Sequence, residues 1–238
     1  MSARFEELGW QQTPMGEFSL RRRFDPTVRA DVYEVKLGDE YLMSSLFTVA
    51  ERELARRGLA RTPGVRVDVL VGGLGLGYTA REALADSRVR TLTVIEYSDA
   101  VIDWHVRDLL PDTAGMAADG RVALVRADFF AAAMGSVGFD PEHAGRTYDA
   151  ILLDIDHSPR HVLHQPHAAF YTEGGLHAVS RYLCPGGTFA MWADGAPDAE
   201  FVSVLAEVFT DVAAELVCFD NPLTRVQSAS TVYLATRG

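Results

Sequence analysis

The spacing of apolar and polar positions differs between two parts of the chain, and it changes near residue 62. In residues 1–44 they alternate one by one, which is the period of β-strands, and Gly38-Asp39 predicts a tight turn between two strands. Residues 46–59 then have the apolar spacing of a helix. We therefore predict short amino-terminal strands with a connecting helix over residues 1–62, followed by a separate domain over residues 63–238.

From residue 63 onward, apolar runs of strand length alternate with segments that have helical spacing. The predicted strands are 67–72, 91–96, 121–126, 148–154, 188–192, 213–219 and 231–235. The predicted helices are 77–86, 99–107, 128–134, 170–183 and 198–208. This alternation predicts an α/β fold with a doubly wound, mostly parallel, seven-stranded Rossmann-like sheet. The last two strands are close enough in sequence to pair as a hairpin.

The first of these strands leads into a glycine-rich turn. The segment reads VDVLVGGLGLGYTAR, in which Gly73, Gly75 and Gly77 separate a buried strand from a helix. Glycine allows a ligand to approach the backbone closely and adopts positive φ angles without strain. The order of strand, turn and helix predicts the first half of a nucleotide-binding unit. Because the motif is short, the alternative to a nucleotide-binding turn is a glycine-rich connection that binds no ligand.

Acidic residues follow the next two predicted strands. Glu96 ends the strand RTLTVIEY about twenty residues after the glycines, where an acid can accept hydrogen bonds from both ribose hydroxyls. The alternative for Glu96 is a solvated strand end. Asp128 comes just past the third strand and suits the amino group of an adenine, with Phe129 and Phe130 flanking it. The sequence therefore predicts a site for an adenosine-containing cofactor.

Two further acids follow the fourth and most apolar strand. Asp154 and Asp156 lie in the segment DIDHSP, beyond the carboxyl end of that strand, where open α/β sheets place their reactive centre. A carboxylate there could hold a cationic amine or remove its proton, so we predict both aspartates to be catalytic. The alternative is a turn in which Asp156 and Ser158 cap local backbone amides.

Four histidines crowd the next residues, and three of them have helical spacing. They are His157, His161, His164 and His167. With a neighbouring aspartate they could bind a metal ion. Prolines bracket the segment, however, and no acidic or cysteine partner completes a known ligand pattern, so we predict no metal site.

Composition narrows the classes of partner. The net charge is −11, with 22 basic and 33 acidic residues, which argues against nucleic acid and anionic membranes and is compatible with a cationic small substrate. The chain has no apolar run of membrane-spanning length and no signal peptide at its start. Cys184 and Cys218 are its two cysteines, which we interpret as reduced. We therefore expect a cytoplasmic protein.

The order of these motifs resembles the spermidine synthase family, the polyamine aminopropyltransferases. The resemblance covers about residues 67–192 and implies the sheet of class I S-adenosylmethionine-dependent methyltransferases. It also implies S-adenosylmethionine or its decarboxylated form as cofactor and a small, amine-bearing acceptor. By this resemblance Glu96 is the ribose-binding acid, Asp128 the acid that meets the adenine, and Asp154 the catalytic acid.

The chain also departs from the family pattern. The aspartate of the family's glycine turn falls on Leu76, which cannot contact the aminopropyl amine of the decarboxylated cofactor, and the second aspartate of the catalytic loop is replaced by His157. Glu51 is the candidate counterpart of an acid on the amino-terminal helix. Three functions stay open: an aminopropyltransferase-like enzyme, a small-molecule methyltransferase, or a nucleoside-binding protein without catalysis. A homodimer is compatible with each.

Overall fold

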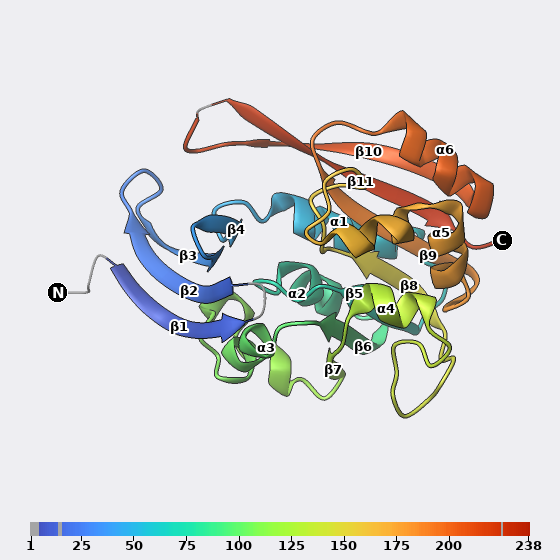
Figure 1. Cartoon of the computed structure of the whole chain (residues 1–238), viewed down its shortest axis with the longest axis horizontal. Coiled ribbons are helices and arrows are strands. Elements are labelled where there is room, and N and C mark those ends of the chain that lie inside the picture. Colours follow the sequence, from blue (N-terminus) through green and yellow to red (C-terminus); the bar gives the residue numbers. More distant parts are fainter. Residues whose placement is uncertain (1–4, 14–15, 225) are drawn as a thin grey trace.

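The structure is a computed structural model, in which residues 5–13, 16–224 and 226–238 are described. The chain forms a small four-stranded sheet beside a larger, seven-stranded one (Figure 1). The small sheet consists of β1 (Phe5–Thr13), β2 (Gly16–Asp25), β3 (Ala30–Leu37) and β4 (Glu40–Ser44), antiparallel and in chain order. The predicted turn at Gly38-Asp39 is confirmed, because it joins β3 to β4.

One face of the small sheet packs against the rest of the molecule. Phe18, Leu20 and Val35 are buried there, as the alternation of apolar and polar residues requires. The ring of Phe18 stacks on Trp104 at a centroid distance of 6.1 Å. This contact fixes the small sheet, and with it β4, against the edge of the main domain.

The seven-stranded sheet has the order β10-β11-β9-β8-β5-β6-β7. Its strands are β5 (Val67–Gly72), β6 (Val89–Glu96), β7 (Val122–Arg126), β8 (Tyr148–Leu153), β9 (Leu183–Asp194), β10 (Thr210–Asp220) and β11 (Gln227–Thr236). All neighbours are parallel except β11, which runs antiparallel to β9 and to β10. The predicted α/β fold and the carboxyl-terminal hairpin are confirmed. The strand order reverses between β5 and β8, which is where such sheets bind their ligands.

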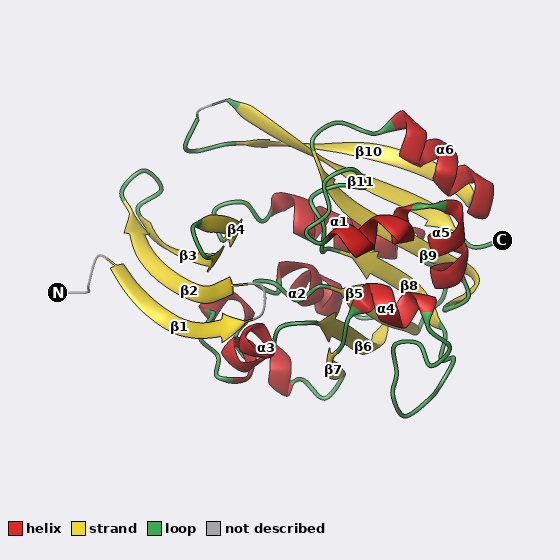
Figure 2. Ribbon diagram, in the orientation of Figure 1, coloured by secondary structure: helices red, strands yellow, loops and turns green. Residues whose placement is uncertain are grey.

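Helices cover both faces of this sheet (Figure 2). They are α1 (Val49–Arg61), α2 (Tyr78–Ala85), α3 (Asp99–Val106), α4 (Phe129–Met134), α5 (Glu173–Ser180) and α6 (Ala199–Val208). The first three share one hydrophobic cluster with alternate residues of the strands, and the last three share the other. Among the described residues, no helix is long and apolar enough to cross a membrane.

The helix predicted over residues 170–183 is shorter in the structure. A 3₁₀ helix runs over Gln165–Tyr171, and α5 begins only after it, at Glu173. The reason is a helix cap: the hydroxyl of Thr172 accepts a hydrogen bond from the Gly175 amide and so starts a new helix.

Helix α1 packs directly on the large sheet. Gly58 lies so close to β8 and β9 that an added Cβ would come within 2.6 Å of Leu152 and 3.1 Å of Ala190. Only glycine permits this approach. The same packing brings Glu51, near the start of α1, to the carboxyl ends of the central strands.

Candidate active site

The glycine turn after β5 is built around three positive φ angles. They are 91° at Gly73, 49° at Gly75 and 85° at Gly77. At Gly73 a Cβ would also come within 2.1 Å of the backbone oxygen of Asp154. Each glycine therefore meets a backbone requirement of the turn, and the turn lies against the residue that follows β8.

A buried histidine supports this turn from behind. Nε2 of His105, on α3, lies 2.9 Å from the backbone oxygen of Gly75, so this nitrogen donates. The hydroxyl of Thr113 donates to the backbone oxygen of Leu76 at 3.3 Å. Burial lowers the pKa of His105, which keeps its ring neutral. Sequence reasoning missed His105, because a single histidine in a short helix belongs to no motif.

Glu96 lies at the end of β6 beside the same turn. Its carboxylate accepts hydrogen bonds from the backbone amides of Leu74, at 3.0 Å, and Ser98, at 2.7 Å. Burial raises the pKa of Glu96, while these amide hydrogen bonds favour the charged form. Glu96 thus joins the strand end to the glycine turn, and a ribose there would meet a carboxylate already fixed in place.

The two residues after β7 have different positions. Asp128 is half-buried, and its Oδ1 caps α4 by accepting from the amides of Phe130, at 2.9 Å, and Ala131, at 3.0 Å. Phe129, which we expected to flank an adenine, is only 2% exposed and stacks on Phe139 at a centroid distance of 4.9 Å. The expectation for Phe129 is corrected: the first turn of α4 directs its ring into the core.

Asp154 and Glu51 form a pair of half-buried acids. Oδ2 of Asp154 accepts a hydrogen bond of 2.6 Å from the hydroxyl of Thr79, on α2. Burial raises the pKa of Asp154 to about 6. Burial, and then the negative charge of Asp154, raises the pKa of Glu51 to about 8. Both pKa values are thus raised, and the proximity of the two carboxyl groups disfavours ionisation of both at once.

Both acids line a pocket of about 110 Å³. Its walls come from β4, the start of α1, the glycine turn with the first residue of α2, the loop after β8 and the end of β9. Beside the two acids, its polar lining includes His157 and Trp192, and much of the remaining wall is apolar. Cofactor sites usually measure about 300–1,000 Å³. This pocket therefore suits a small acceptor or the reacting end of a cofactor.

Asp156, which we predicted to be catalytic, does not line this pocket. Its carboxylate is fully buried and accepts hydrogen bonds from the Leu163 amide at 2.7 Å and the Tyr171 hydroxyl at 2.8 Å. Nδ1 of His167 lies 3.1 Å from the same carboxylate. The prediction is corrected: these three groups turn Asp156 inward, where it anchors the loop after β8.

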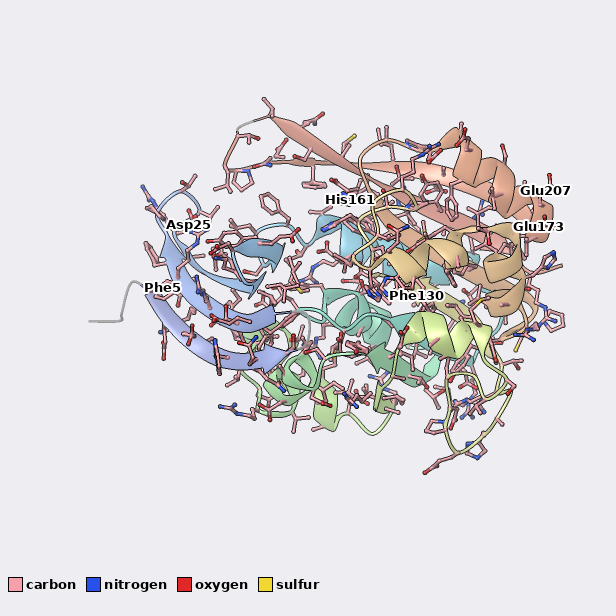
Figure 3. All side chains as sticks on the ribbon, viewed as in Figure 1. Phe5, Asp25, Phe130, His161, Glu173 and Glu207 are labelled. Carbon is pink, nitrogen blue, oxygen red and sulfur yellow. The ribbon has the colours of Figure 1, made fainter. Side chains whose placement is uncertain are left out.

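The four histidines of this loop point in different directions. His167 stacks on Phe130 of α4 at a centroid distance of 3.9 Å, and His157 lines the pocket. His161 and His164 are exposed, and Figure 3 labels His161 and Phe130 on their separate elements. Within residues 5–13, 16–224 and 226–238, no three histidine, cysteine or acidic side chains are grouped to hold a metal ion.

Comparison with known proteins identifies the fold. The sequence matches no protein-family model, and no curated protein is significantly similar to it. The structure of spermidine synthase from Thermotoga maritima is similar to this one. The alignment covers 98% of this chain and 72% of the spermidine synthase chain, with a TM-score of 0.71 and 17% sequence identity. A spermidine synthase in complex with the transition state analogue AdoDATO matches with the same values. The resemblance seen in the sequence is thus confirmed for the fold, which is that of spermidine synthase and of class I methyltransferases.

Proposed function

We propose that the protein is a transferase that moves a group from an adenosyl sulfonium compound to a small amine acceptor. The observation that carries this proposal is Asp154, a half-buried carboxylate in a pocket at the carboxyl ends of the central strands, against the glycine turn. The similar spermidine synthase fold, one example of which is bound to a transition state analogue, supports it.

The residues of the site fit the two halves of such a donor. The glycine turn exposes backbone without side chains, and Glu96 offers a carboxylate to ribose hydroxyls. Asp128 stands past the neighbouring strand, on the adenine side of the proposed site. The negative charge on Asp154 and Glu51 suits a positively charged sulfonium and an amine.

The proposed reaction is a nucleophilic substitution. The lone pair of the amine nitrogen forms a bond to a carbon of the sulfonium. The bond from that carbon to sulfur breaks, and its electron pair leaves a neutral thioether. Asp154 accepts the proton that the nitrogen loses, while Thr79 holds the other face of the carboxyl group through its hydroxyl. The remaining work of the site is alignment of nitrogen, carbon and sulfur.

Leu76 favours methyl transfer as a second candidate. Its side chain lines the pocket and is 6% exposed, at the position where the family carries an aspartate. Without that acid, the aminopropyl ammonium of the decarboxylated cofactor lacks its expected partner. The same arrangement of base and acceptor would serve S-adenosylmethionine as a methyl donor.

Glu96→Ala tests the cofactor half of the proposal. The variant is expected to bind S-adenosylmethionine, its decarboxylated form and methylthioadenosine more weakly by about 1.5–3 kcal/mol, because it removes charge-assisted hydrogen bonds to the ribose. Calorimetric titration measures the loss. Glu207→Ala, on the exposed part of α6 (Figure 3), is the control, and unchanged affinity in Glu96→Ala would contradict the assignment.

Leu76→Asp tests which sulfonium compound is preferred. The added carboxylate is expected to raise affinity for the decarboxylated form relative to S-adenosylmethionine, because it supplies a partner for the aminopropyl ammonium. Leu76→Asn has the same size without the charge and should leave the ratio of the two affinities unchanged. A wild-type protein that already prefers the decarboxylated form strongly would show that our interpretation of Leu76 is wrong.

A further inference from the structure

We propose that the acceptor carries a single amine on an apolar body, and that diamines are poor acceptors. This inference rests on the proposed function and names the substrate class of the same pocket. Two features carry it: the pocket has acids at one place only, and the rest of its described lining offers a second ammonium no carboxylate and is largely hydrocarbon.

The first feature is the position of the acidic groups. Among the described residues that line the pocket, Glu51 and Asp154 are the acids. They lie close enough for the charge of Asp154 to help keep Glu51 protonated, as its raised pKa of about 8 reflects. The pocket therefore holds its acidic groups together, beside the glycine turn, and its described lining adds no acid elsewhere.

The second feature is the rest of the wall. Leu42 and Met43 from β4, Leu76 from the glycine turn, and Ile155 and Leu163 from the loop after β8 are all apolar. An ammonium ion that leaves water needs a charged or hydrogen-bond-accepting partner, and hydrocarbon provides neither. These side chains instead suit the carbon chain of an amine.

Trp192 strengthens this argument. Its indole lines the pocket, and Nε1 is buried without a hydrogen-bond acceptor among the described residues. An indole nitrogen only donates, so Nε1 is no acceptor for an ammonium group. The ring faces of Trp192 and Tyr78 attract a cation, but more weakly than a carboxylate does. The imidazole of His157 adds no negative charge. Desolvation of a second ammonium group would thus not be offset by an ion pair with a carboxylate.

Matched acceptors test the inference. Wild-type protein is given 1-aminobutane or 1,4-diaminobutane, each with S-adenosylmethionine and, in parallel, with the decarboxylated form. Thioether release, followed by chromatography and mass spectrometry, reports reaction from either donor. We expect kcat/KM for the monoamine to exceed that for the diamine by roughly tenfold or more, because the second charge is unpaired.

A charge placed at the rim provides a matched pair of variants. Leu163 is 46% exposed and lines the pocket, so it tolerates a polar replacement. Leu163→Asp should move the ratio of the two kcat/KM values toward the diamine several-fold, whereas Leu163→Asn, of the same size and uncharged, should not. The backbone amide of Leu163, which donates to Asp156, is kept in both variants.

Each outcome decides one of the two proposals. Wild-type protein that uses the diamine as well as the monoamine would overturn the single-amine inference and leave the transferase proposal intact. The single-amine inference would also be overturned if Leu163→Asp left the ratio of the two kcat/KM values unchanged. Release of no thioether with either amine and either donor would overturn the proposed transfer to amines, and the inference with it.

Discussion

Asp154→Asn is expected to lower turnover by about 10²–10⁴-fold, the usual contribution of a positioned base. The asparagine has the shape of the aspartate but cannot take the proton that the attacking nitrogen must lose. It keeps an oxygen that can accept the hydrogen bond of Thr79, so the local structure should persist. Affinity for the adenosyl compound should change little, because Asp154 acts on the acceptor. Steady-state thioether release and calorimetric titration measure the two quantities separately.

Asp156→Asn is the matched control for this prediction. Asp156 carries the same charge two residues away, but its carboxylate is buried against Tyr171 and the Leu163 amide, outside the pocket. Its replacement should lower thermal stability while costing much less turnover per folded molecule than Asp154→Asn. If Asp154→Asn protein turned over an acceptor at the wild-type rate, Asp154 would have no part in the chemistry.

The fold could be predicted from the sequence because its signals are local. A strand buried on both faces, such as Val67–Gly72, is apolar apart from the ion-paired Asp68, and the turn after it must contain glycine where φ is positive. Both requirements are visible within fifteen residues. Repeated along the chain, such signals indicate a doubly wound sheet and the edge at which its strands end.

Side-chain direction could not be predicted in the same way. Asp154 lines the pocket and Asp156 is turned away from it, although they are two residues apart in one loop. The difference depends on Tyr171, which follows much later in the chain and binds Asp156 through its hydroxyl. Phe129 is a similar case, because its ring packs in the core against Phe139, in the loop after α4, and Phe170, in the 3₁₀ helix.

The pairing of Glu51 with Asp154 depends on tertiary packing as well. No motif connects them, and they meet because α1 packs closely on β8 and β9 at Gly58. The resemblance to a known family suggested a role for Glu51, but the raised pKa of its carboxyl group requires the burial and the neighbouring charge that only the folded chain provides.

This pairing predicts an unusual dependence of stability on pH. Folding raises the pKa of Glu51 from 4.5 to about 8 and that of Asp154 from 3.8 to about 6. At these two groups the folded state binds more protons than the unfolded state, so their contribution to stability is present at acidic pH and is lost as pH rises through the folded pKa values.

Glu51→Gln is therefore expected to stabilise the protein at alkaline pH. Glutamine fills the same space and never ionises, so the variant should match the wild type near pH 4.5 and exceed its melting temperature above pH 8 by on the order of 10 °C. Thermal denaturation at several pH values measures the difference. Glu53→Gln is the control on the same helix: Arg57 holds the pKa of Glu53 low, so this variant should lose stability instead. A wild-type protein whose melting temperature rose from pH 5 to pH 9 as much as that of Glu51→Gln would show that Glu51 ionises normally in the folded chain.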